Sequence, residues 1–133
     1  MKYVRFVPSA SLLAVIVCAA LLIGCGAGHP TIRSITVSPQ TAKGTVNSGT
    51  VVYTATGNFT DNTSRQLTVA DGLTWASSNT VVATIDDGGA ASCKSIGTVT
   101  ITATAPQNLT ITVGTGINNS STKISGTAQL VCQ

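Results

Sequence analysis

The chain has few aromatic and charged side chains and lacks glutamate altogether. Among its 133 residues, aromatic side chains make up 4% and charged ones 8%, and His29 is the only histidine. Histidine is the side chain that most often transfers protons in enzymes, and glutamate is another that does so. The sequence therefore predicts a protein that is not an enzyme and that carries no metal ion or cofactor.

The acidic side chains that are present are typical of turns. Asp61, Asp71, Asp86 and Asp87 lie beside Asn or Gly, where an Asp side chain stabilises a turn by bonding to its own backbone. His29 falls in a segment expected to be a tether, away from other polar clusters, so no catalytic triad is expected. A calcium site at the strand ends stays open as an alternative.

The charge balance gives no reason to expect nucleic acid as a partner. After residue 24 the chain carries five basic and four acidic side chains, and the basic ones are scattered rather than gathered in a stripe. Nucleic-acid binding depends on a concentrated basic surface.

The first 24 residues have the layout of a secretory signal. Lys2 and Arg5 precede an apolar run from Leu12 to Ile23, and small residues follow. The run is shorter than the roughly 20 apolar residues that a membrane-spanning helix needs. Residues 1–24 are therefore expected to form a signal-peptide helix that is removed during export.

The end of this run resembles the lipobox of bacterial lipoproteins. "Leu22-Ile23-Gly24-Cys25" matches that motif at all four positions. The resemblance implies that Cys25 is lipid-modified and anchors the chain to a membrane, with residues 25–31 as a lipidated tether. Gly26 rather than Asp follows the cysteine, which resembles outer-membrane sorting if the organism is Gram-negative. Cleavage near Ala27 without lipid stays open as an alternative.

Two further cysteines lie in the part of the chain that would be exported. Cys93 and Cys132 both fall in the apolar phase of predicted strands, so both side chains should point inward. An even pair of cysteines in an exported protein is typical of a disulfide. We therefore predict a bond between Cys93 and Cys132.

The remainder of the chain is rich in Thr, Val and Ile, which favour strands. In "GTVTITATA" (97–105), apolar residues alternate with threonines, which predicts one buried and one exposed face. Similar stretches recur at 34–39, 51–59, 81–86 and 124–132, with turn signals between them. This pattern predicts an all-β antiparallel sandwich of about seven strands, preceded by the signal-peptide helix.

Residues 32–105 resemble bacterial Ig-like domains of group 2. The motifs "SITVSP", "YTATG", "TWASSN", "VATI" and "GTVTITAT" follow one another in the order and spacing of that family. The resemblance implies an Ig-like domain over residues 32–133. It also places Trp75 at the centre of the core, where the other expected core residues are Tyr53, Phe59 and Ile101. A Trp75 that stacks on a ligand at the surface stays open as an alternative.

The segment from Pro106 to Lys123 departs from that family pattern. Its first part, Leu109–Val113, alternates as a strand would, and the following tip contains Gly114, Gly116, Asn118 and Asn119. These residues would suit a binding loop for a saccharide or a peptide backbone. An insertion without function stays open as the alternative.

Taken together, these features predict a lipid-anchored module of the cell envelope with a non-catalytic binding or adhesion role. Its partners would be the membrane, through the lipid anchor, and an envelope protein or saccharide. Two alternatives stay open: a structural accessory subunit of an envelope complex, and a small carbohydrate-binding module.

Overall fold

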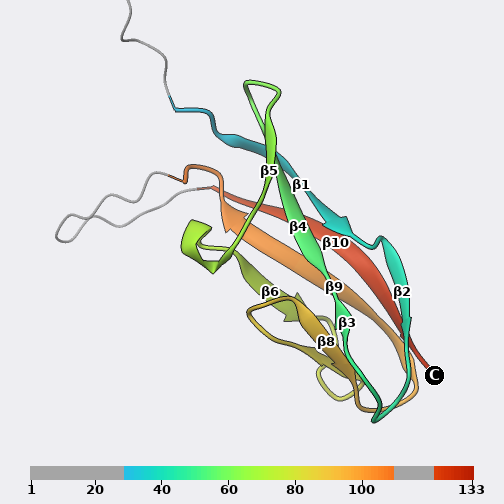
Figure 1. The fold of residues 1–133 in the computed structure, drawn as a ribbon. Coiled ribbons are helices and arrows are strands. Elements are labelled where there is room, and N and C mark those ends of the chain that lie inside the picture. Colours follow the sequence, from blue (N-terminus) through green and yellow to red (C-terminus); the bar gives the residue numbers. More distant parts are fainter. Residues whose placement is uncertain (1–28, 110–121) are drawn as a thin grey trace, which may run out of the picture.

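A computed structural model describes residues 29–109 and 122–133. Strands dominate these residues, and one short 3-10 turn lies among them (Figure 1). The elements are β1 (Ile32–Ser38), β2 (Thr41–Gly44), β3 (Val51–Val52), β4 (Thr54–Phe59), β5 (Ser64–Gln66), η1 (Val69–Asp71), β6 (Thr74–Ser77), β7 (Ala83–Ile85), β8 (Ala90–Cys93), β9 (Gly97–Pro106) and β10 (Lys123–Cys132). The expectation of an all-β fold is confirmed.

The strands form three small sheets with the orders β1-β4-β5, β2-β10-β9-β6 and β3-β8-β7. Tyr53 alone separates β3 from β4, and Figure 1 shows β3 continuing the line of β4. The first and third sheets therefore share one layer of the sandwich. The second sheet is the other layer, and the Tyr53 hydroxyl donates across to the Gln129 carbonyl oxygen at 2.9 Å.

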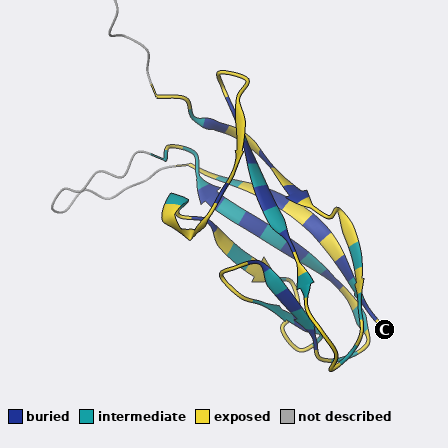
Figure 2. Cartoon of the chain, in the orientation of Figure 1, coloured by how far each residue is buried: buried dark blue, intermediate teal, exposed yellow. Residues whose placement is uncertain are grey.

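Alternating side chains explain why these segments form strands around one core. Along β9, Val99, Ile101, Ala103 and Ala105 are buried, whereas none of the threonines between them is. Figure 2 shows the same alternation along the other long strands. A pleated strand points successive side chains to opposite faces, so each long strand gives one face to the core. The inward faces that the sequence predicted for β1, β4, β9 and β10 are the buried ones.

One strand pairing is parallel, which the antiparallel prediction did not include. The β1 ladder with β4 ends at Ser38, and the next residue, Pro39, has no N–H to donate to a ladder. The chain then crosses to the other layer, where β2 runs parallel to β10 from the Thr41–Gln129 pair to the Gly44–Cys132 pair. β2 has only four residues and little apolar content, so it shows no alternation from which a strand could be predicted.

The core consists mostly of alanine and aliphatic side chains, with Tyr53 and Phe59 as its aromatic members. At one place the two layers approach so closely that only glycine fits. A Cβ atom at Gly126 on β10 would overlap the Ile35 carbonyl oxygen on β1. Gly126 therefore sets the distance between β1 and β10.

Some predicted segments lie outside the described residues. These are the signal-peptide helix, the lipidated Cys25 and the tip that contains Gly114, Gly116, Asn118 and Asn119. Of the predicted strand Leu109–Val113, only Leu109 is described; it is not in a strand and packs, partly buried, against the core. Among the residues that the structure describes, no helix is long and apolar enough to cross a membrane.

Candidate functional site

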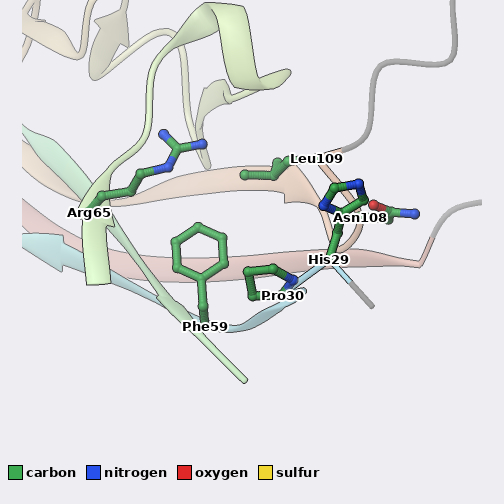
Figure 3. A pocket seen from close by; sticks show the side chains of 6 residues that line it. All are labelled: His29, Pro30, Phe59, Arg65, Asn108 and Leu109. Atoms are coloured by element: carbon green, nitrogen blue, oxygen red, sulfur yellow. The ribbon is translucent and has the colours of Figure 1, made fainter. Parts of the chain in front are cut away.

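The end of the sandwich at which β1 begins carries a pocket of about 320 Å³, which we call the Phe59 pocket. Three segments line it: the residues before β1, the hairpin of β4 and β5, and the residues after β9. Figure 3 shows the Phe59 ring between Arg65 and Pro30. The lining residues are His29, Pro30, Phe59, Arg65, Asn108 and Leu109.

A tight turn between β4 and β5 brings Arg65 next to Phe59. The Asp61 carboxylate accepts bonds from the Thr63 N–H at 3.0 Å and from the Thr63 hydroxyl at 2.6 Å. These bonds hold the pKa of Asp61 below its ordinary value. Asn62 adopts the left-handed backbone conformation that reverses the chain, a conformation that Asn tolerates well. Arg65 then pairs with Gly57, and its guanidinium lies 5.5 Å from the centre of the Phe59 ring.

The Arg65 guanidinium is held on its other side by Asp71. Its two terminal nitrogens donate to the two Asp71 carboxylate oxygens at 3.0 and 2.6 Å. One of those oxygens also accepts the Thr68 N–H at 2.9 Å. The bonds from Arg65, and then those from Thr68, lower the pKa of Asp71 to about 2. Asp71 therefore stays ionised, and the bidentate pair fixes the direction of the guanidinium.

The Phe59 pocket can hold a ligand but has few side chains that could catalyse the breaking of a bond. It presents one aromatic ring, one guanidinium already paired with a carboxylate, and polar groups from His29 and Asn108 at its outer edge. Within residues 29–109 and 122–133, no group of three His, Cys, Asp or Glu side chains could hold a metal ion.

The structure places the expected core residues as follows. Tyr53, Phe59 and Ile101 are buried, with exposed fractions of 1%, 6% and 0%. Trp75 lies on β6 and is only partly buried, packed against the core rather than at its centre. It occupies this position because β6 is an edge strand with no ladder partner beyond it in its sheet.

The predicted disulfide is present and joins the two layers. Cys93 on β8 is bonded to Cys132 on β10, with a Cα–Cα distance of 5.6 Å. Both cysteines are buried. The bond lies at the end of the sandwich where β9 begins, because Cys132 pairs with Gly97.

Two features of the Phe59 pocket were not predicted. The sequence placed His29 in a tether away from other polar groups, but its side chain lines the pocket together with Arg65 and Asn108. That expectation was wrong because folding brings the chain before β1 next to the chain after β9, where the Ile32 N–H donates to the Gln107 carbonyl oxygen at 2.8 Å. The Arg65–Asp71 pair was also missed; the Thr-x-x-Asp spacing of Thr68 and Asp71 is a capping pattern that could have drawn attention to it.

Comparison with known proteins agrees with this architecture. Residues 67–107 match the family model described as "Intimin, immunoglobulin-like domain". This segment runs from the residues before η1 to the end of β9 and includes Trp75. The sandwich and this match together support a bacterial Ig-like domain.

One curated relative is also similar to part of this chain. "Ice-binding protein 1" of Shewanella frigidimarina (strain NCIMB 400) is 41% identical over 76 residues, which is 57% of this chain. The matched region is 8% of the relative, so the chain spans only a small part of that protein. The similarity carries no activity across by itself.

Proposed function

We propose that this chain is a lipid-anchored module of the cell envelope, an Ig-like domain of group 2 with a non-catalytic binding or adhesion role. The observation that carries the proposal is the lipobox at Leu22–Cys25, which follows an apolar run of signal-peptide length. If the organism is Gram-negative, the outer membrane is the expected location.

Two features of the described residues support export to the envelope. The Cys93–Cys132 disulfide is of the kind that persists in oxidising compartments outside the cytoplasm. The match to an intimin Ig-like domain relates this chain to a family of domains found in surface proteins. Together they favour a domain that works outside the cytoplasm.

The start of β1 sets how far the domain would extend from its anchor. β1 begins at Ile32, and the residues between it and Cys25 are those of the short tether 26–31. Even when fully extended at roughly 3.4 Å per residue, this tether reaches about 20 Å. The domain would therefore work near the membrane surface, with the Phe59 pocket at its membrane-facing end.

Membrane attachment is tested by replacing Cys25 with Ser and following the protein in fractionated cells. The unmodified chain is expected in the membrane fraction, and Cys25→Ser is expected to lose lipid and leave that fraction. Cys18→Ser is the matched control, because Cys18 lies within the apolar run and should not affect anchoring. Equal membrane association of Cys25→Ser and the unmodified chain would contradict the proposal.

The proposed partners are an envelope protein or a saccharide, with no role for nucleic acid. The Phe59 pocket supports a binding role because an aromatic ring lines it. Asn108 and Leu109, which also line it, directly precede segment 110–121 in the sequence. Pull-down from envelope extracts with the full chain and with a variant in which residues 114–122 are replaced by a two-residue turn tests whether that segment takes part. Recovery of the same partners by both forms would show that segment 114–122 is not required.

A structural accessory role in an envelope complex is the second candidate, and one surface feature favours it. Val81 and Ile96 are 74% and 80% exposed and lie in the loops that precede β7 and β9. The loops are held together by the Ser95 hydroxyl, which donates to the Val81 carbonyl oxygen at 3.0 Å. Exposed aliphatic side chains on adjacent loops favour contact with another protein.

A further inference from the structure

A second hollow, which we call the Trp75 notch, lies where one layer of the sandwich is split between two sheets. β5 pairs with part of β4, and β8 pairs with β3. Because β5 and β8 belong to different sheets, the layer is open between the end of β5 and the turn that joins β7 to β8. The notch has a volume of about 150 Å³. Such a volume suits a single ring rather than a drug-sized ligand, which needs about 300 Å³ or more.

The floor of the Trp75 notch is aromatic, and its two aromatic residues differ in accessibility. Tyr53 is 1% exposed and its hydroxyl is already bonded to the Gln129 carbonyl oxygen. Trp75 is only partly buried, and its six-membered ring lies so close to Gly89 that a Cβ atom there would be 3.3 Å from two of the ring carbons. The indole N–H has no hydrogen-bond acceptor within the described residues and is not buried, so it can still donate to a ligand.

The rim of the Trp75 notch supplies hydrogen-bonding groups that the fold does not use. The side chains of Gln66, at the end of β5, and Asp87, in the turn after β7, are exposed. Neither makes a side-chain hydrogen bond to another residue in the described part of the chain. The amide can both donate and accept, and the carboxylate accepts. Among the residues that the structure describes, no Lys, Arg or His lines the notch.

We infer that the Trp75 notch is a binding site for a single neutral pyranose ring, such as one residue of an envelope saccharide. A pyranose has an apolar C–H face and a rim of hydroxyls, which match one accessible indole and a rim of amide and carboxylate. The absence of a lining cation disfavours phosphate and other anions. Cages for organic cations present several aromatic faces, and here Tyr53 is sealed in the core.

This inference rests on the binding role proposed above and identifies the class of ligand. It is tested with the full chain, purified from membranes in detergent. Trp75 is the only tryptophan of the chain, so tryptophan fluorescence reports on the notch directly. The titrated probes are glucose and N-acetylglucosamine. Sorbitol, an acyclic polyol, and tetramethylammonium, an organic cation, serve as comparison probes.

At least one of the two sugars is expected to change Trp75 emission in a saturable way, with half-saturation on the order of 1–10 mM. Asp87→Ala is expected to weaken that binding about tenfold and Gln66→Ala about threefold or more. Gln129→Ala is the matched control; this exposed side chain lies on β10 in the other layer, and the variant should bind as the unmodified chain does. Unchanged thermal unfolding of each variant separates loss of binding from loss of fold.

Several results would overturn the inference. These are no saturable change with either sugar, an equal response to sorbitol, a response to tetramethylammonium in place of the sugars, or binding that is undiminished in both rim variants. Each of them leaves the membrane attachment of Cys25 untouched, because fractionation measures that attachment separately.

Discussion

The two ends of the sandwich are closed by different kinds of interaction. At the end where β9 begins, the buried Cys93–Cys132 bond ties one layer covalently to the other. At the end where β1 begins, the Arg65–Asp71 pair and the contact of Arg65 with Phe59 hold the surface together, and a pocket remains beside them. A covalent bond and a solvent-screened ion pair should contribute very different amounts to the stability of this small domain.

Removing the Cys93–Cys132 bond should have the largest effect on the stability of the domain. The chain between Cys93 and Cys132 closes a loop with a sequence separation of 39 residues. On the chain-entropy model this bond contributes about 4 kcal/mol to the free energy of unfolding. A Cys93→Ala/Cys132→Ala variant should therefore lose about that amount in urea unfolding. Detection of two free thiols in the non-reduced, unmodified chain would show that the Cys93–Cys132 bond does not form.

Disturbing the close contact between β1 and β10 should have the next largest effect on stability. Gly126→Ala places a methyl group against the Ile35 carbonyl oxygen, so the layers must separate or the strand must shift. Overpacking of this kind costs about 1–3 kcal/mol. Gly88→Ala is the control, because the nearest atom to its Cβ would be an Asp86 side-chain oxygen at 3.3 Å. Equal thermal unfolding of the two variants would show that β1 and β10 are not closely packed there.

The ion pair at the other end should have the smallest effect. Asp71→Asn is expected to lower the free energy of unfolding by about 1 kcal/mol at pH 7, because Arg65 is half exposed and solvent screens the pair. The pKa of Asp71 is lowered to about 2, so its contribution is present above pH 4 and is lost as the pH falls through 2. Urea unfolding at pH 7, 4 and 2 should show the difference from the unmodified chain shrinking. Asp87→Asn, which removes an exposed carboxylate with no ion-pair partner in the described part of the chain, is the control.

The sequence predicted those parts of the fold that depend on side-chain periodicity. Alternation along β9 and β10 gave their buried faces, and an even pair of cysteines in the apolar phase gave the disulfide. Periodicity shows which face of a strand is buried but not which strand lies beside it. The parallel pairing of β2 with β10 therefore escaped prediction, as did the split between the sheets of β5 and β8.

The sites were less predictable than the fold because they are assembled from residues far apart in the chain. The Phe59 pocket is lined by both His29 and Asn108, and the Trp75 notch is lined by both Gln66 and Asp87. Neither pair forms a local motif. Trp75 was expected at the core centre on the strength of a family resemblance, and its position on an edge strand is what leaves it accessible.

We propose that a lipid on Cys25 holds the domain at the membrane. The most direct test is the intact mass, together with the N-terminal peptide, of the mature protein isolated from membranes. We expect a chain that begins at Cys25 and carries added acyl mass on that residue. A mature chain that begins at Ala27 or later, without lipid, would contradict it.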